Sequence, residues 1–96
     1  MVVEAQHDVT SISGAVTFET VAALLAELMP KVSKAQSAMI IDMSQVDLVN
    51  SAALSLVASL VRHAKRQGKQ LSFENVPARL IALSQVCGVE EILALK

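Results

Sequence analysis

The stretch AMIIDMSQVDLVNSAALSLVASLV, residues 38–61, sets the expected architecture. It begins with a short apolar run over residues 38–43, in which Asp42 is the one polar residue, and such a run is typical of a strand buried on both faces in a parallel sheet. Residues 44–50 are interpreted as a loop. Apolar residues then recur with helical spacing, so we predict a helix over residues 51–67 that Gly68 terminates. The residues on its core-facing side should be Ala53, Leu56, Val57, Leu60 and Ala64.

The segment before this stretch predicts two strands and a helix. Residues 2–5 and 9–13 have the composition of short strands, although their alternation is imperfect. Thr17 occupies the place of a helix N-cap, and Phe18 begins an apolar helical face. Pro30 should end or kink this first helix, because proline removes a backbone donor and clashes with the preceding turn.

The segment after the stretch predicts one more strand and one more helix. Residues 71–74 alternate like a strand with one exposed face, and residues 77–86 start with a proline at the first helical position. Residues 89–95 should form a short last turn. We therefore expect a single α/β domain over residues 1–96, a sandwich of a four- to five-stranded mixed sheet with three to four helices.

Composition restricts the classes of function. The chain has 96 residues, a net charge of -1, 53% hydrophobic and only 18% charged residues, so part of its surface should meet a partner. It has no Trp or Tyr and two Phe, which leaves little surface for stacking on bases and argues against nucleic-acid binding. Its one cysteine fits a reducing compartment. Without a visible signal peptide or an apolar stretch of ~20 residues, we expect a cytoplasmic protein with no direct membrane insertion.

The helix predicted from residue 51 carries small hydroxyls where charged side chains would be expected to face water. In one interpretation, Ser51 or Asn50 caps the helix and Ser55 faces solvent. In another, this helix end docks on a protein, because small uncharged side chains allow close approach and Leu54 offers an apolar anchor. A phosphate on Ser51 would also be stabilised at a helix N-terminus and would disrupt such docking. The candidate partner-binding residues are Asn50, Ser51, Ala52, Leu54, Ser55 and Ala58, and Ser51 is the candidate phosphoacceptor.

Other reactive residue types do not assemble into a recognisable site. His7 and His63 lack a third ligand nearby in sequence, so no metal or cofactor is expected. Cys87 lies on an apolar face before a glycine and is interpreted as buried packing. Asp42, at a strand end, is interpreted as a structural or loop-capping residue. No nucleotide-binding loop and no Ser-His-Asp arrangement is present, so we predict that the protein is not an enzyme.

Several segments in order resemble the STAS domain family. Residues 42–44 (DMS) and 49–54 (VNSAAL) are similar to the core motif of that family, a strand ending in Asp-Leu-Ser followed by Asp-Ser-Ser/Ala-Gly-Leu at a helix start. Further segments look like its MlaB branch, the small STAS subunits of Mla-type phospholipid ABC transporters. These segments are residues 14–20, 24–25, 65–69, 77–80 and 87–89.

The resemblance implies a function and a partner. MlaB-like subunits bind the cytoplasmic ATPase of the transporter, and through it the permease, and support transport that maintains outer-membrane lipid asymmetry. It implies that Ser51 lies at the ATPase contact and that the protein is peripheral to the inner membrane. The alternative is an anti-sigma-factor antagonist whose Ser51 is phosphorylated by a partner serine kinase. Asn50 stands where the family has Asp and Ala53 where it has Gly, and the loss of the Asp charge weakens the kinase alternative more than docking.

Overall fold

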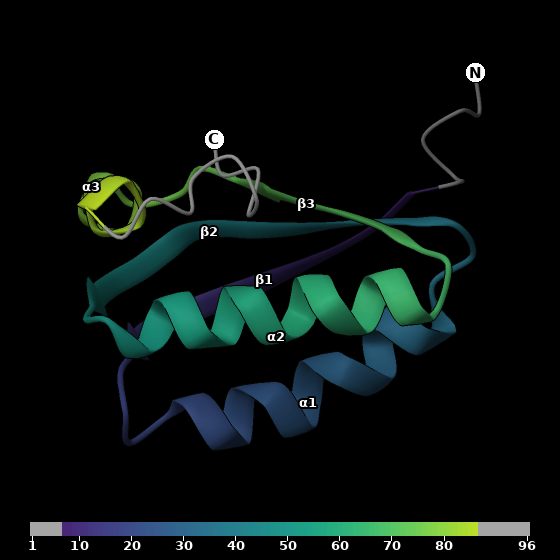
Figure 1. The fold of residues 1–96 in the computed structure, drawn as a ribbon, viewed down its shortest axis with the longest axis horizontal. Coiled ribbons are helices and arrows are strands. Elements are labelled where there is room, and N and C mark those ends of the chain that lie inside the picture. The colour runs from purple at the N-terminus through teal and green to yellow at the C-terminus, as the bar shows by residue number, and fades with distance from the viewer. Residues whose placement is uncertain (1–6, 87–96) are drawn as a thin grey trace.

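A computed structural model describes residues 7–86 as three parallel strands and three helices (Figure 1). The strands pair in the order β1-β2-β3, with both pairings parallel. No helix in this described range is both long enough and apolar enough to span a bilayer. The elements are β1 (His7–Val16), α1 (Val21–Lys34), β2 (Ala38–Val49), α2 (Ala52–Arg66), β3 (Gln70–Glu74) and α3 (Ala78–Val86).

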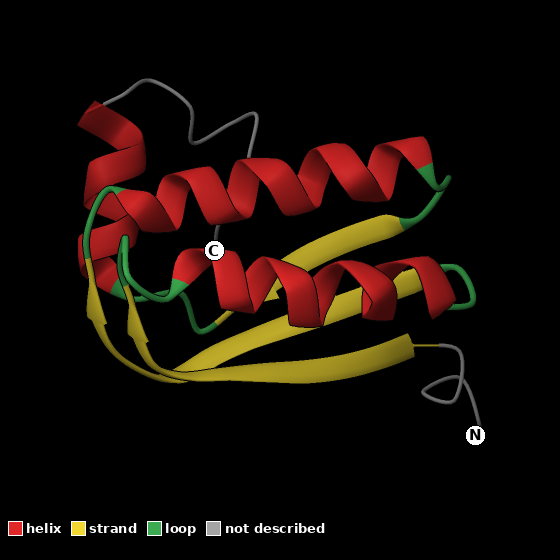
Figure 2. Ribbon diagram, turned by 90° about the horizontal axis from the view of Figure 1, so that it is seen from below, coloured by secondary structure: helices red, strands yellow, loops and turns green. Residues whose placement is uncertain are grey.

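Helices α1 and α2 lie side by side on one face of the sheet, and α3 lies near the end where β1 and β2 finish (Figures 1 and 2). In β2, Met39, Ile41 and Met43 are buried, whereas alternate residues such as Ile40 are half-buried. The expectation of a strand buried on both faces is therefore wrong. Within residues 7–86, helices cover one face and leave the other partly open.

The core lies between this face of the sheet and the two long helices. Phe73 of β3 is fully buried there, and each such large apolar side chain contributes about 1.5–3 kcal/mol of burial free energy. The core-facing side predicted for α2 is confirmed, since all of its members are buried. These members are Ala53, Leu56, Val57, Leu60 and Ala64.

The described sheet has three strands, not the four to five mixed strands that the sequence predicted. The predicted strand over residues 9–13 is part of β1, which continues to Val16 because its whole length pairs with β2. The predicted strand over residues 2–5 and the predicted final turn over residues 89–95 lie outside the described residues.

Strand β2 also continues where a loop was predicted over residues 44–50. Its second half pairs with the end of β1, with Val46 opposite Gly14 and Val49 opposite Val16. The register shifts between Gly14 and Ala15, and Gly14 has a φ of 79°, a conformation that glycine adopts without strain. The bulge lets the ribbon bend, so the polar residues of this half remain exposed while Val49 is buried.

Helix α1 begins later and ends later than predicted. The Thr17 carbonyl accepts hydrogen bonds from the backbone N–H groups of Thr20 and Val21, so Thr17 starts a turn that precedes the helix. The helix then passes through Pro30 to Lys34. Leu28 and Val32, both buried, anchor it on either side of the proline and offset the cost of the missing N–H.

We predict that Pro30→Ala stabilises the protein. The substitution restores a backbone donor inside α1 and removes a ring from a helix interior, where proline costs up to ~3 kcal/mol relative to alanine. Chemical denaturation should show the free energy of unfolding raised by about 1–3 kcal/mol.

The matched control is Pro77→Ala, since Pro77 is the chain's second proline and directly precedes α3. Proline is tolerated at a helix start, so this change should leave the free energy of unfolding within ~0.5 kcal/mol of wild type. Equal effects of the two substitutions would contradict the assignment of a continuous helix through Pro30.

Candidate functional site

The candidate site lies at the carboxyl ends of β1 and β2, where α2 begins. Because β1 and β2 are parallel and finish opposite one another at Val16 and Val49, the segments that follow them emerge at the same edge. The Asn50 N–H donates to the Val16 carbonyl at 3.3 Å and ties the two segments together. In open α/β sheets this edge is the usual place for recognition.

The cap of α2 is supplied by Asn50. Its Oδ1 accepts a hydrogen bond from the Ala52 N–H at 2.9 Å, and its backbone carbonyl accepts one from Ala53 at 2.9 Å. Ser51 directly precedes the helix, but among the described residues its side chain makes no capping hydrogen bond. The sequence left the cap open between these two residues, and the structure assigns it to Asn50. Ser51 is exposed.

The six candidate partner-binding residues are not equally accessible. Ser51 and Ser55 are exposed, while Asn50, Leu54 and Ala58 are half-buried. Ala52 is buried, so its methyl group presents almost no surface to a partner. The reason is local: Ala52 is the first residue of α2 and turns toward the molecule, whereas Ser51 and Ser55 face away.

Two exposed apolar residues at this edge were not among the site residues predicted from the sequence. Phe18 is 67% exposed and Leu48 is 58% exposed. Phe18 was predicted on the apolar face of a helix, but it lies in the turn before α1. Leu48 was placed in a loop, and it lies in β2 opposite Ala15, directly after the register shift. Side chains alternate between the two faces of a strand, so Leu48 is exposed while its neighbour Val49 is buried.

Five residues near this edge, from the turn after β1, the end of β2 and the start of α2, are together called the docking surface: Phe18, Leu48, Ser51, Leu54 and Ser55. It combines apolar and small hydroxyl side chains with no charge of its own. Its charged sequence neighbours are acidic: Glu19 follows Phe18, and Asp47 precedes Leu48. Large exposed apolar side chains gathered at one edge are typical of a protein interaction site.

Two polar side chains, those of Arg79 and Thr20, hold the backbone around the docking surface through three hydrogen bonds. The Arg79 Nε donates to the Val49 carbonyl at 3.2 Å and joins α3 to the end of β2. The Thr20 hydroxyl donates to the Ala15 carbonyl and accepts from the Thr17 N–H, each at 2.9 Å. A small hollow of about 130 Å³ lies between residues 46–49 and the start of α3. The surface is therefore held by fixed backbone on both sides of Ser51.

Asp42 has the structural role that the sequence suggested, away from the docking surface. Its carboxylate accepts hydrogen bonds from the Asn75 side chain at 2.8 Å and from the Ser44 hydroxyl and N–H at 2.9 and 3.1 Å. The Asn75 bond, followed by the two from Ser44, lowers the pKa of Asp42 below its usual value. Asn75 itself has a φ of 55°, so this contact helps to hold the turn from β3 toward α3.

The two histidines begin or lie in different elements of the described part of the chain. His63 Nε2 lies 2.8 Å from the Ser33 hydroxyl and joins α2 to α1. His7 begins β1, far along the sequence from His63, and Cys87 lies outside the described residues. Residues 7–86 hold no group of three potential metal-ligating side chains.

Comparison with known proteins identifies the family. A family model described as "Mlab, STAS domain" matches residues 2–95, nearly the whole chain. The chain therefore belongs to the STAS domain family, in agreement with the motifs at residues 42–44 and 49–54. No curated protein matches it.

Solved structures share the fold. The chain is similar to a sulfate transporter family protein from Wolinella succinogenes, with a TM-score of 0.73, 17% identity and coverage of 92% of this chain and 71% of that one. It is also similar to a protein named Mglu, with a TM-score of 0.63, 20% identity and 77% coverage of this chain. The native form of Mglu gives a TM-score of 0.61, 16% identity and 75% coverage. This chain spans 18% and 21% of the length of the two Mglu chains.

We predict that Asn50 stabilises the start of α2, whereas the neighbouring Ser51 contributes little to stability. Asn50→Ala should lower the free energy of unfolding by about 1 kcal/mol, because the Ala52 N–H loses its acceptor. Ser51→Ala should change it by less than ~0.5 kcal/mol, because the hydroxyl makes no capping bond. Urea denaturation of both variants measures the difference, and a larger loss for Ser51→Ala would contradict the assignment of the cap.

Proposed function

We propose that this protein is a non-catalytic subunit that binds the ATPase of a phospholipid-transporting ABC complex through the docking surface. The complex would place the protein at the cytoplasmic side of the inner membrane without inserting it into the bilayer. Transport by such a complex would serve the lipid asymmetry of the outer membrane.

The observation that carries the proposal is the exposed Ser51, whose side chain does not cap α2, at the same edge of the sheet as the exposed apolar residues Phe18 and Leu48. A hydroxyl used for capping would be explained by local structure alone, but the Asn50 side chain already satisfies the helix start. Exposed large apolar side chains have an unfavourable contact with water that a partner would remove. The family description, which names Mlab, supports the choice of an ABC transporter partner.

The chemistry of this surface favours recognition over reaction. Within residues 7–86, no described hydrogen bond joins the Ser51 hydroxyl to a base that would activate it as a nucleophile, and His63 bonds to Ser33. Apolar anchors surrounded by small side chains are what a protein interface needs at its centre. The acidic neighbours Glu19 and Asp47 suit a rim that meets basic residues of the partner.

A second candidate function has one specific observation in its favour. An anti-sigma-factor antagonist needs a serine that a kinase can reach, and Ser51 is exposed at a helix start, where free N–H groups stabilise a phosphate. Asn50 in place of an aspartate makes this candidate the weaker one.

We predict that Ser51→Arg abolishes binding to the ATPase. The substitution places a long charged side chain in the uncharged centre of the docking surface, where a desolvated and unpaired charge is costly. Co-purification of the tagged ATPase with this protein should fall by at least tenfold, while the circular dichroism spectrum and the melting temperature stay near wild type.

The matched control is Gln67→Arg, which adds the same side chain at the exposed opposite end of α2. It should co-purify with the ATPase as the wild-type protein does. Undiminished binding by Ser51→Arg would overturn the proposed contact. The antagonist candidate is tested by incubating the protein with ATP and the serine kinase whose gene lies nearest its own.

Mass spectrometry then measures phosphate on Ser51. One phosphate per chain would favour the antagonist over the transporter subunit.

A further inference from the structure

The end of the molecule opposite the docking surface is strongly basic. Of the Lys and Arg side chains in residues 7–86, all but Arg79 lie in the last turns of α1 and α2 or just before β3. Part of this charge faces the negative ends of the two helix dipoles. The residues are Lys31, Lys34, Arg62, Lys65, Arg66 and Lys69.

A hollow of about 410 Å³ opens within this basic end. It lies between the last turns of α2 and the first residues of β2 and β3, and its volume is in the ~300–1,000 Å³ range of small-molecule sites. Its apolar lining consists of the side chains Met39, Val61, Ala64 and Leu71, together with Ala38. Its cationic lining consists of Lys65 and Lys69.

The two lysines have different surroundings. Lys69 donates from Nζ to the backbone carbonyl of Ala35 and, at 3.5 Å, to that of Gln36, so it also fixes the end of α1. Lys65 is exposed, and among the described residues it has no ion-pair partner within 4.0 Å. Lys65 is therefore the cation at the hollow that a ligand can engage without breaking an internal contact.

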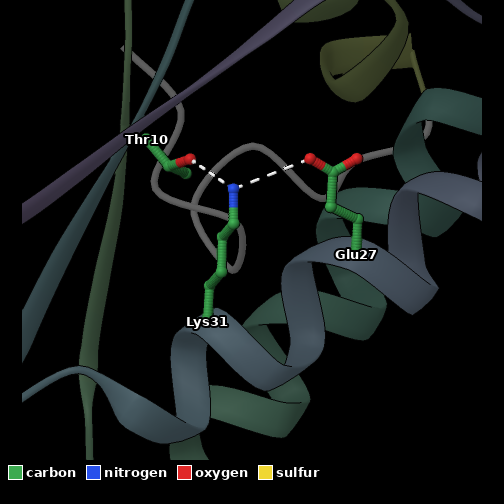
Figure 3. Close-up of polar contacts among 3 residues, drawn as sticks. All are labelled: Thr10, Glu27 and Lys31. Atoms are coloured by element: carbon green, nitrogen blue, oxygen red, sulfur yellow. Dashed lines mark hydrogen bonds and ion pairs between the residues drawn. The ribbon is translucent and has the colours of Figure 1, made fainter.

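A second hollow beside the first is also lined by lysines, which add to the positive electrostatic potential of this end of the molecule. It measures about 320 Å³, shares Met39 with the first hollow, and is lined by Lys31 and Lys34. Lys31 lies between two oxygens, its Nζ 3.4 Å from the Thr10 hydroxyl and 3.6 Å from the Glu27 carboxylate (Figure 3). Glu27 thus offsets Lys31 but does not reach Lys34, Lys65 or Lys69 by any described ion pair.

The lining selects the chemistry of a ligand. The described residues that line the 410 Å³ hollow include no acidic side chain, which disfavours a cation, and no aromatic one, which disfavours a nucleotide base or a sugar ring. Lysines alone would suit inorganic phosphate, but with phosphate bound the apolar lining of the hollow would stay in contact with water. The apolar lining and the lysines at its edge together match a molecule with a hydrocarbon chain and an anionic head group.

We propose that this hollow binds a single-chain anionic amphiphile of the fatty-acid class. The acyl chain lies against the half-buried side chains of Val61 and Leu71, and the carboxylate pairs with Lys65. Burial of the chain supplies most of the binding free energy, and the head group sets the orientation and selects for negative charge. This site is at the other end of α2 from the docking surface, so ligand binding here does not depend on the proposed ATPase contact.

The test uses the full chain, labelled with nitrogen-15, and laurate below its critical micelle concentration. Amide shifts should saturate with one laurate per chain and should be largest for residues 38–39, 61–65 and 69–72. Dodecyltrimethylammonium carries a similar chain on a cationic head and should bind at least tenfold more weakly. Inorganic phosphate should produce no saturable shifts at these residues.

Variants separate the two parts of the site. Lys65→Glu should weaken laurate binding about tenfold, because it replaces an attraction by a repulsion, and Lys65→Arg should keep the affinity within about twofold. The double variant Gln45→Glu with Gln85→Glu makes the same change in net charge at exposed positions elsewhere and should bind as wild type does. Val61→Phe should exclude the chain by filling the hollow, with the melting temperature showing that the fold is intact.

Three outcomes would overturn the proposal. Equal affinities for laurate and dodecyltrimethylammonium would show that the head group is not recognised. Undiminished binding by Lys65→Glu would place the ligand elsewhere. Binding to phosphatidylglycerol vesicles without binding to monomeric laurate would show that the basic end meets a bilayer surface and that the hollow holds no single chain.

Discussion

The parallel pairing of β1 with β2, maintained to Val16 and Val49, is the constraint on which the rest of this structure depends. It brings both strands to the same edge, and the Asn50 N–H bond to Val16 then fixes where α2 begins. The exposed turn after β1 and the start of α2 become one surface only because of this pairing. A shorter β2, ending near Met43 as the sequence suggested, would leave Leu48 and Ser51 on a loop with no fixed relation to Phe18.

The two ends of α2 have opposite character, and the sheet explains why. At the carboxyl edge of the strands the helix begins with small uncharged residues and meets exposed apolar side chains. At the amino edge it ends in basic residues, next to the basic end of α1. Because α1 and α2 both connect parallel strands, they run in the same direction, and their C-termini with their cations gather at one edge. The net charge of -1 conceals this separation.

The sequence predicted the features that depend on the periodicity of apolar residues, but not those that depend on how the strands pair. The helical spacing of Leu56, Val57 and Leu60 gave the buried side of α2 correctly, and the motif around Ser51 indicated the family. The length of β2 follows from its pairing with β1 through two register shifts, between Ser11 and Ser13 and between Gly14 and Ala15, which no local pattern encodes. The passage of α1 through Pro30 follows from burial of Leu28 and Val32, which offsets a local preference.

The division of labour between Asn50 and Ser51 has a consequence for how such a protein diversifies. Since the amide of Asn50 holds the helix start, natural selection on stability acts on position 50 and leaves position 51 open to drift. Under the proposed function, a lineage that exchanges the hydroxyl for another small group would change its binding specificity while the scaffold stays intact. Related chains built on this architecture should therefore vary more in whom they recognise than in how they fold.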